Sequence, residues 1–565
     1  MPFSTHSRGK ANGSRPSVSS SQDSSSISSS SGTILDTTHY PELRPLPQAH
    51  APMACVDPAF AVPFDMSILT ISHKRDHNSV KAVIVGGGIA GLATAIMMGM
   101  AGMEYEILER TTGKEPNTAC AIVLGPPVLR LMEQMELLPE IERLSKPISG
   151  LTIVDGECRR MGRVDGVETE RYGYDVRIIG HNDFHQILLA KVSKSYLHRG
   201  KVVVDILQNP NGVSCHCSDG SIYYGDITIG ADGAHSQTRE RMYMQLKEQG
   251  KLPEADMEAS LFDHVAIGGV SDPLDRNIYT TCQEPASEFQ VIYIKESPYT
   301  LWYLPMTENR VAWGISHNQP PKIKHHPYSN SSPTPPSTHG SPYDLSLPSH
   351  DQPKPATPPL SRSHSQTKIY DDWHAPAKID LEAQYKDLLD AHCAIGPGTV
   401  RDFVTHTPKK SLVMIDLEER LYKTWYHGRI VLIGDACHQH LVIGGQGAVQ
   451  SLLDGVCLVN LLYDMDHNTP NALAKAFKRY QAKRCSLAKT SIEETSQIAN
   501  IFHGQGLRAG IMRKFMFNSV WSFNMKNDKF NNNRPQLSFL PFVEDRGLCK
   551  ASRQKISSKM PGHTI

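Results

Sequence analysis

The chain has 565 residues and a mass of 62.6 kDa, with 58 basic and 58 acidic side chains, so its formal net charge is zero. This length predicts two to three folded units. The balanced charge argues against a protein held to nucleic acid by bulk electrostatics, and we expect no nucleic-acid partner. The eleven Cys are scattered and odd in number, which argues against a disulfide framework and favours the cytoplasm.

Two segments are predicted to be disordered. The first is an N-terminal tail over residues 1–75, in which eleven of the fifteen residues from 17 to 31 are Ser. The second is a Pro-rich insertion at 319–368, inside folded sequence. Its PxxP spacings, Pro333 to Pro336 and Pro355 to Pro358, would suit an SH3-type groove, although an inert surface loop is the simpler interpretation.

A strand, a glycine-rich turn and a helix follow one another after the tail. Lys81–Val85 is predicted to be a buried strand, and Gly86, Gly88 and Gly91 then give the pattern G-x-G-x-x-G before an apolar helix. The first glycine allows the tight turn, the second lets the backbone approach a pyrophosphate, and the third lets helix and strand pack closely. The sequence therefore predicts a dinucleotide site at the N-terminus of this helix.

An acidic residue completes this pattern. Residues 103–110 are predicted to be the second strand, and Glu109 lies near its end, 23 positions after Gly86. This is close to the spacing at which a carboxylate meets the ribose hydroxyls of the bound adenosine. Glu109 is therefore a predicted cofactor ligand.

Two later segments repeat the layout of a strand that runs into a carboxylate. Residues 226–230 lead to Asp232, and residues 428–434 lead to Asp435 and then to a glycine turn. In this order the three motifs resemble those of the single-component flavin-dependent aromatic hydroxylase family, of the para-hydroxybenzoate hydroxylase and ubiquinone hydroxylase type. The chain looks most like the fungal FAD-dependent monooxygenases, over about residues 80–500 apart from the Pro-rich insertion.

This resemblance implies an α/β fold, with a Rossmann-type FAD-binding domain, an inserted β-sheet substrate domain and a C-terminal helical region. The FAD-binding domain is expected at 76–150 and again at 426–500, on either side of the substrate domain and returning strands at 151–425. A helical extension and tail would follow at 501–565. Strands are expected at 289–294, 300–305 and 311–315, and a helix at 381–391.

The resemblance also implies which residues hold FAD. Asp435 would bind the ribityl chain, and the turn at 445–448 would pack near the isoalloxazine ring. A helix beginning at Gly447 would point its positive end at the flavin. His181 stands where the family usually has Arg. The predicted cofactor-binding residues are Gly86, Gly88, Gly91, Glu109, Ala119, Val123, His181, Asp232, Asp435, Gly445, Gly447 and Ala448.

The implied chemistry is monooxygenation. NAD(P)H would bind transiently and reduce FAD. O₂ would then form a flavin hydroperoxide that hydroxylates or epoxidises a hydrophobic aromatic or isoprenoid substrate. We assign no catalytic acid or base. We also expect no metal site, because Cys215 and Cys217 have no partner pair at zinc spacing.

Several interpretations stay open. A flavoprotein reductase of isoprenoid double bonds would share the first motif, and a flavin-binding interaction protein would use the Ser-rich and Pro-rich segments for docking. The apolar residues 507–525 are expected to pack on the core as a helix, or to contact a membrane surface. Trp302 and Tyr303 are candidate walls of the substrate pocket, while no role is assigned to Trp313, Tyr422, Trp425 and His438.

Overall fold

The computed structural model describes residues 80–113, 120–166, 168–294, 297–324, 381–393, 395–441, 445–503 and 530–560. These residues belong to the second of two units, Phe64–Ile565, and the first unit, Met1–Pro63, lies outside them. The predicted N-terminal tail, the PxxP spacings, the cofactor contact at Ala119 and the apolar residues 507–525 also lie outside the described residues.

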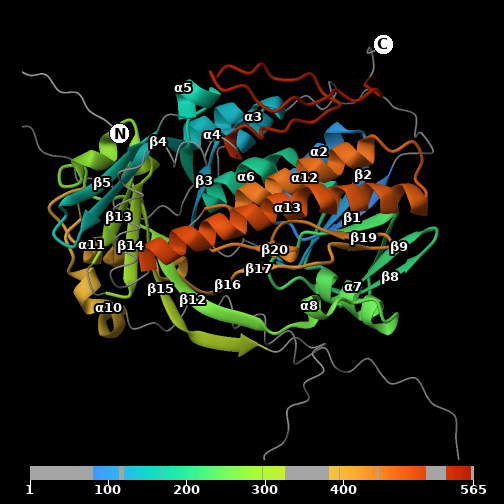
Figure 1. Ribbon diagram of the computed structural model, residues 1–565, viewed down its shortest axis with the longest axis horizontal. Coiled ribbons are helices and arrows are strands. Elements are labelled where there is room, and N and C mark those ends of the chain that lie inside the picture. The colour runs from blue at the N-terminus through green and yellow to red at the C-terminus, as the bar shows by residue number, and fades with distance from the viewer. Residues whose placement is uncertain are drawn as a thin grey trace, which may run out of the picture. The chain divides into compact units, whose positions relative to one another are not determined.

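A six-stranded sheet carries the three predicted motifs (Figure 1). Its middle strands are parallel, because β1 pairs with β2 on one side and with β11 on the other, and β11 pairs with β19. Their carboxyl ends therefore meet at one edge, where Val85, Gly230 and Leu432 lie in register. The strands, in sheet order, are β18 (Tyr426–His427), β19 (Ile430–Leu432), β11 (Ile227–Gly230), β1 (Lys81–Val85), β2 (Glu104–Glu109) and β7 (Leu197–Arg199).

Apolar helices pack next to this sheet. Gly455 of α12 (Gly447–Tyr463) lets this helix approach α2 (Ile89–Met100) closely, since a Cβ atom on Gly455 would lie 2.7 Å from Thr94 Oγ1 of α2. In Figure 1, α12 lies beside the long helix α13 (Pro470–His503). The remaining helices of this part are α3 (Pro126–Gln134), α4 (Leu138–Leu144), α5 (Glu168–Tyr172), α6 (His181–Lys191), α7 (Gln237–Glu248) and α8 (Glu254–Met257).

A second, nine-stranded sheet forms the other large layer. One of its faces packs against α10 (Leu381–Leu389) and α11 (Val400–Thr405), around the fully buried Trp313 and Tyr303. The end of α13 reaches the opposite face through Phe502. The strands are β16 (Val413–Glu418), β12 (Ser260–Val270), β15 (Val311–Lys324), β14 (Tyr299–Pro305), β13 (Ser287–Tyr293), β4 (Ser145–Asp155), β6 (Arg177–Gly180) and β3 (Ala121–Leu124), with β5 (Arg160–Asp165) beside β4.

Short elements complete the described structure. A three-stranded sheet joins β8 (Val203–Asn209), β9 (Gly212–Cys217) and β10 (Ile222–Gly225), and β17 (Arg420–Leu421) pairs with β20 (His438–Gln439). One-turn 3₁₀ helices lie at Lys194–Tyr196, Thr280–Gln283, Thr307–Asn309, Lys409–Ser411 and Gly434–Ala436. The predicted mixed α/β fold is confirmed, including the strands expected near 289–294 and 300–305 and the helix expected at 381–391.

The predicted start of the Pro-rich insertion at 319 is wrong, because β15 continues to Lys324. Residues 319–321 lie where the pairing of β12 with β15 shifts register, between the pairs His264–Asn318 and Phe262–Lys322. Pro cannot donate to a strand ladder, but a bulge leaves such residues unpaired. The bulge therefore accommodates two prolines that, from the sequence alone, predict the end of the strand.

Residues 530–560 run across α3 and α12 without a strand or a helix longer than a turn, and we call them the C-terminal strap. Gln134 on α3 accepts a hydrogen bond from the Leu537 amide at 2.7 Å and donates to the Leu537 carbonyl at 3.1 Å. Arg130 donates to the Val543 carbonyl at 2.6 Å. Leu537 and Phe539 are buried in the main core, so the strap is part of the folded unit.

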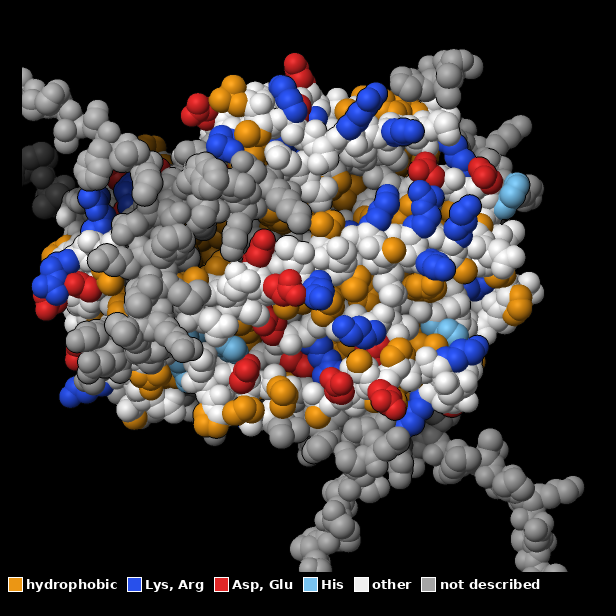
Figure 2. Space-filling model, in the orientation of Figure 1, with side chains coloured by type: hydrophobic (Ala, Val, Ile, Leu, Met, Phe, Trp, Pro, Cys, Tyr) orange, Lys and Arg blue, Asp and Glu red, His pale blue; other side chains and the backbone are white. Residues whose placement is uncertain are grey.

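No helix in the described part of the chain is both long and apolar enough to cross a membrane. The visible face carries acidic and basic side chains interspersed (Figure 2).

Candidate functional site

The glycine-rich turn after β1 has the geometry that its spacing predicts. Gly86 has a φ of +110°, and a Cβ atom there would lie 2.4 Å from the Ala231 carbonyl oxygen. A Cβ atom on Gly91 would lie 2.0 Å from the Gly86 carbonyl oxygen. On Gly88, by contrast, a Cβ atom would meet no atom within 4 Å. Gly86 and Gly91 are thus required by the fold, whereas Gly88 borders open space.

The N-terminus of α2 lies at this open space. No side chain caps it, and its first turn contains no acidic residue, so the terminal N–H groups and the positive end of the helix dipole are not neutralised locally. Such a terminus is suited to bind the phosphates of a dinucleotide.

Glu109 lies beside the same turn. Its Oε2 accepts a hydrogen bond from the Gly87 amide at 2.6 Å, and its Oε1 accepts from the Thr111 amide at 2.8 Å. Sequence reasoning missed a second contact, in which His185 Nε2 lies 2.8 Å from the Gly87 carbonyl oxygen. Gly87 is therefore held from both sides, and the carboxylate of Glu109 fixes the turn.

His181 is the first residue of α6, and its amide donates to the Cys120 carbonyl at 2.8 Å. Its ring is nearly parallel to that of His185, with the centroids 6.5 Å apart. Burial and the neighbouring His185 lower the pKa of His181 to about 4. Unlike the Arg usual in the family, His181 is neutral near pH 7 and offers hydrogen bonds rather than charge.

Asp232 serves mainly as a helix cap. Its Oδ2 accepts from the amide and hydroxyl of Thr238 at 2.9 and 3.0 Å, and its Oδ1 accepts from Ser236 Oγ at 2.5 Å, at the start of α7. Gly86 packs against the backbone of Ala231 and Asp232. The second motif thus joins the site through its backbone, and its carboxylate is directed to α7.

Asp435 follows β19 in a tight turn, in which Gly434 has a φ of +61°. From Arg429 to Leu441 it is the single exposed residue in a buried segment. Although the residue is exposed, the surrounding protein partly desolvates its carboxyl and raises the pKa of Asp435, while His438 lowers this pKa and Asp454 raises it. A carboxylate held at such a position is a strong acceptor for ligand hydroxyls.

The glycine turn at 445–448 lies next to Asp435. A Cβ atom on Gly447 would lie 3.7 Å from Asp435 Oδ1, and a Cβ atom on Gly445 would lie 3.8 Å from Val123 Cβ. Gly447 begins α12, whose N-terminus has no side-chain cap, and Ala448 packs on the main core. The structure thus brings together four predicted site residues from two distant segments: Val123 from one, and Asp435, Gly445 and Gly447 from the other.

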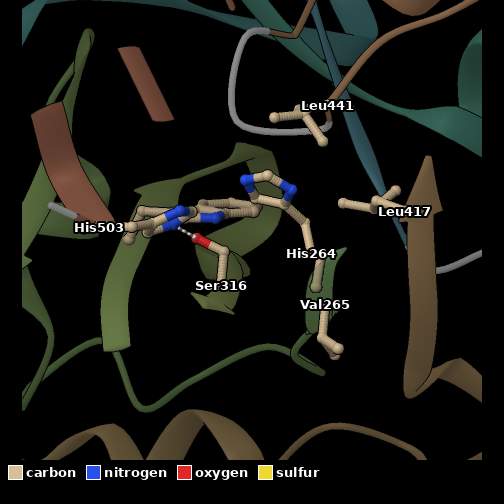
Figure 3. Close-up of a pocket in the computed structure, with 8 residues that line it drawn as sticks. His264, Val265, Ser316, Leu417, Leu441 and His503 are labelled. Atoms are coloured by element: carbon tan, nitrogen blue, oxygen red, sulfur yellow. Dashed lines mark hydrogen bonds between the residues drawn. The ribbon is translucent and has the colours of Figure 1, made fainter. Parts of the chain in front are cut away.

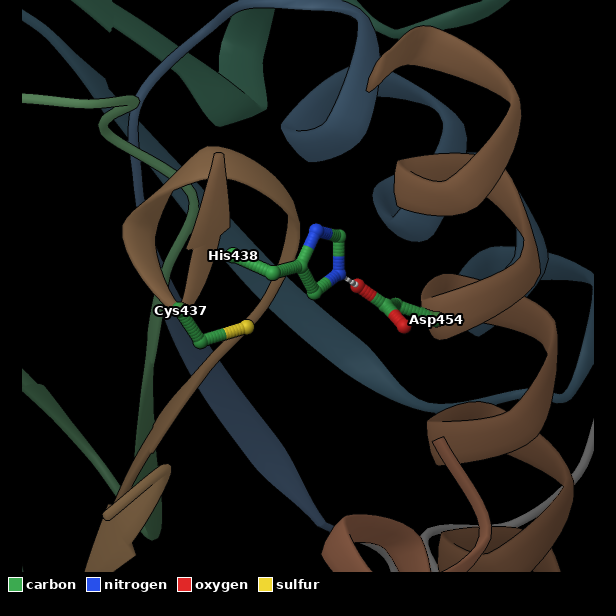
Figure 4. A group of neighbouring side chains, drawn as sticks. All are labelled: Cys437, His438 and Asp454. Carbon is green, nitrogen blue, oxygen red and sulfur yellow. Dashed lines mark hydrogen bonds and ion pairs between the residues drawn. The ribbon is translucent and has the colours of Figure 1, made fainter. Parts of the chain in front are cut away.

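A buried charge network joins the turn that carries Asp435 to α12 and α13, and Figure 4 shows two of its members, His438 and Asp454. The Asp454 carboxylate accepts from His438 Nε2 at 2.6 Å, from Arg484 Nε at 2.7 Å and from the Gly434 amide at 2.9 Å. Arg484 also donates to Gln450 Oε1 at 2.6 Å. His438 and Arg484 lower the pKa of Asp454 to about 2 against its burial, so the carboxylate is ionised. His438, to which no role was assigned from the sequence, positions the third motif.

The same group does not resemble a metal centre. Cys437, His438 and Asp454 offer ligand atoms within 4.8 Å of one another (Figure 4). Both Asp454 oxygens, however, already accept hydrogen bonds, and one pairs with the permanent cation Arg484. Burial raises the pKa of the Cys437 thiol well above its usual value, whereas a metal needs the thiolate.

The candidate pocket aromatics divide between two faces of the second sheet. Trp302 packs against Phe289, with ring centroids 6.0 Å apart, on the face that also includes Val123. Tyr303 is fully buried on the opposite face. Trp302 is therefore a candidate wall, and Tyr303 is core. Trp313 donates to Thr407 Oγ1 within the same core, Trp425 donates to the Tyr422 carbonyl, and Tyr422 lies under Arg239.

Comparison with known proteins gives a consistent result. The family model described as "FAD binding domain" matches residues 79–328 and 360–495. Among curated proteins, the FAD-dependent monooxygenase pyr5 of Aspergillus fumigatus is 26% identical over 387 residues, 68% of this chain and 72% of the relative. The FAD-dependent monooxygenase ausM of Penicillium brasilianum is 24% identical and covers 80% of this chain and 84% of its own length.

Solved structures share the fold at low sequence identity. Klebsiella pneumoniae HpxO complexed with FAD and uric acid has a TM-score of 0.57 at 16% identity, over 80% of this chain and 96% of that one. A salicylate hydroxylase substrate complex has a TM-score of 0.53 at 17% identity, over the same shares of the two chains. The family match spans more than half of the sequence. The chain belongs to the FAD binding domain family and is an FAD-dependent oxidoreductase of the monooxygenase type.

Proposed function

We propose that this protein takes reducing equivalents from NAD(P)H and uses O₂ to hydroxylate or epoxidise a hydrophobic aromatic or isoprenoid compound. The observation that carries the proposal is the convergence of three remote segments at one sheet edge. The Gly-rich turn, the backbone at Asp232 and the turn at Asp435 follow three adjacent parallel strands, β1, β11 and β19. Ligands of open α/β sheets bind at such carboxyl ends.

The proposed cofactor contacts follow from this arrangement. The free N-terminus of α2 beside Gly88 would hold the pyrophosphate, and Glu109 would receive the adenosine ribose. Asp435 would bind the ribityl hydroxyls, and the N-terminus of α12 would face the flavin ring. When bound, FAD supplies the redox chemistry, and a positive helix end near the ring would favour negative charge on its reduced form.

The proposed substrate class rests on the apolar face of the second sheet. Val123, a proposed neighbour of the flavin ring, packs with a group of apolar residues from β14, β15 and β13, which includes Ala312, Phe289 and Trp302. An apolar wall next to the flavin would bind a hydrophobic molecule and exclude water from the reacting atoms. The names of these monooxygenase relatives contain no substrate, so the proposed substrate class depends on this apolar wall alone.

NAD(P)H is proposed as a transient co-substrate. Within the described residues, the turn after β1 is the one G-x-G-x-x-G turn that joins a strand to a helix, and FAD would fill it. The ten cysteines of the described residues are all free thiols, which supports the proposed action in the reducing cytoplasm.

The test is spectroscopic. The purified protein should be yellow, release FAD on denaturation, lose its flavin absorbance with NADPH or NADH and regain it in air. O₂ uptake coupled to an oxygenated product supports the monooxygenase, whereas anaerobic reduction of a double bond would identify a reductase. A colourless protein that takes up no FAD on reconstitution would refute the proposal.

A single substitution tests the site assignment. Asp435→Ala should lower FAD affinity about tenfold or more, because hydrogen bonds to a charged group are stronger than neutral ones. Asp272→Ala removes an exposed carboxylate outside the site and should leave the FAD content unchanged. Equal FAD content in both variants would show that Asp435 does not hold the cofactor.

A further inference from the structure

A small cavity lies between the second sheet and the end of α13 (Figure 3). Its volume is about 10 Å³, and its polar lining consists of His264 on β12, Ser316 on β15 and His503 at the end of α13. Leu441 and Trp302 contribute apolar walls. None of these polar groups was singled out by the sequence motifs or takes part in the proposed flavin contacts.

His503 is the central polar group of this cavity. Its Nε2 lies 2.8 Å from Ser316 Oγ, and the two side chains point toward one another in Figure 3. Its Nδ1 is buried and has no hydrogen-bond partner within the described residues. The residue is 6% exposed, so the open nitrogen cannot be satisfied by bulk solvent. A buried nitrogen of this kind is a costly feature unless a ligand or a water completes it.

The imidazole of His503 is neutral. Burial, with His264 and His317 nearby, lowers its pKa to about 4. His264 is oriented by Asp263, with 2.6 Å between Nδ1 and Oδ1, and its ring centroid lies 5.9 Å from that of His503. A neutral imidazole presents one donor and one acceptor, and which nitrogen carries the proton depends on the bond to Ser316.

The ligand chemistry follows from size and hydrogen bonding. A cavity of this volume holds about one water-sized group. If Ser316 accepts from Nε2, then Nδ1 is an acceptor; if Ser316 donates to Nε2, then Nδ1 is a donor. A hydroxyl group satisfies either state, because it both donates and accepts. Among the described lining residues there is no Lys or Arg, so an anionic group would lack a cationic partner there.

We propose that this cavity is the hydroxyl-binding end of the substrate pocket, in which His503 Nδ1 makes a hydrogen bond to a hydroxyl group of the substrate and replaces a bound water. Two of its lining residues, Leu441 and Trp302, belong to segments that also border the proposed flavin site. Leu441 lies four residues before Gly445, and Trp302 belongs to the apolar group that includes Val123. The proposal rests on the proposed function, because it describes where that enzyme holds its substrate.

The test compares phenol with toluene, two probes of similar size that differ in one hydroxyl group. Their dissociation constants for the FAD-loaded enzyme are measured by titration of the flavin absorbance spectrum. Phenol should bind about tenfold more tightly than toluene, since a site built for a hydroxyl discriminates against an analogue that leaves its polar group unpaired. His503→Leu should abolish this preference and retain toluene binding. Ser316→Ala should reduce the preference, and His503→Gln should keep part of it.

The matched control is His317→Leu. His317 is adjacent to Ser316 on β15 but lies near Tyr385, with 3.1 Å between Nε2 and the Tyr385 hydroxyl. Because successive strand residues point to opposite faces, this variant removes an imidazole from the other face of the sheet and should leave the preference for phenol intact.

The outcomes separate this proposal from the proposed function. Equal binding of phenol and toluene, no phenol binding, or a preference that survives in a folded His503→Leu or persists in full in Ser316→Ala would overturn the hydroxyl site. O₂ uptake with NADPH and with NADH is measured on the same preparations. A phenol preference without O₂ uptake with either NADPH or NADH would leave the hydroxyl site standing and refute the proposed reaction.

Discussion

The amide of Gly434 donates a hydrogen bond of 2.9 Å to Asp454, a residue of the following helix. This bond attaches the turn that presents Asp435 to a carboxylate that is fully buried and paired with Arg484. The position of Asp435, the proposed ligand of the ribityl chain, is thus fixed by buried charges that are not among the proposed cofactor contacts.

Removal of the Asp454 charge should destabilise the protein strongly. Asp454→Asn leaves the Arg484 guanidinium buried without its anion, and loss of one partner of a buried ion pair costs about 3–5 kcal/mol. Urea unfolding of the two proteins measures the difference. Glu493→Gln, which breaks the exposed pair of Glu493 with Lys489, is the control and should cost less than about 1 kcal/mol. Equal midpoints for the two variants would show that the buried network contributes no more than a surface pair.

Stability should fall as the pH drops below about 6.5, the usual pKa of His. Burial, with a neighbouring His in each case, lowers the pKa of His181 to about 4, of His440 to about 3 and of His503 to about 4. Between pH 6.5 and 4 the unfolded chain therefore binds more protons than the folded protein. The free energy of unfolding that is present above pH 6.5 is thus lost on acidification toward pH 4. Each group contributes at most about 1.4 kcal/mol per pH unit.

His440→Leu isolates one of these contributions. Both ring nitrogens of His440 are buried without a partner in the described structure, so the apolar side chain should be tolerated at pH 7.5. Its urea midpoint should depend less steeply on pH between 6.5 and 5 than that of the parent protein. The same pH dependence in both proteins would contradict the assignment.

Alanine at Gly88 and at Gly91 should have opposite consequences. Gly91→Ala forces a Cβ atom to within 2.0 Å of the Gly86 carbonyl oxygen, so the protein should unfold more easily, by several kcal/mol. Gly88 has a φ of −75° and open space around it, so Gly88→Ala should fold normally. Its methyl group would occupy the proposed pyrophosphate position, and FAD affinity should fall. Thermal unfolding and FAD titration of both variants distinguish the two roles.

Arg239 should act as a positioning residue between the second and third motifs. It donates to the Ala436 carbonyl at 3.0 Å and to the Ala234 carbonyl at 2.8 Å, and its guanidinium lies 4.3 Å from the Tyr422 ring centroid. Arg239→Lys keeps the charge but loses the forked donor geometry, so FAD affinity should fall about tenfold while kcat at saturating FAD changes less. Arg241→Lys, on the same helix, is the control. An unchanged FAD affinity would argue that the two motifs are held independently.

Local patterns of the sequence predict the first motif well. The roles of Gly86 and Gly91 depend on residues a few positions away or on the adjacent strand, and the strand–turn–helix order already contains that information. The role of Asp232 is harder to predict. Its carboxylate binds the start of the following helix, a local capping role, whereas the motif resemblance suggests a cofactor contact.

The charge network could not be predicted from one sequence. Asp454 and Arg484 lie thirty positions apart on two different helices, and only the packing of α12 against α13 makes them neighbours. The same limit applies to His503 and Ser316, which are 187 positions apart. His185 lies four residues after His181 on α6, and this spacing predicts only that the two rings share a face of the helix, not the contact of His185 with Gly87.

The C-terminal strap has a practical consequence for biochemistry on this enzyme. A protein shortened to end after α13 would leave Gln134 and Arg130 without their hydrogen bonds to the backbone of the strap. It would also expose the apolar residues that Leu537 covers. Deletion mapping from that end would therefore report loss of folding rather than loss of a separable module.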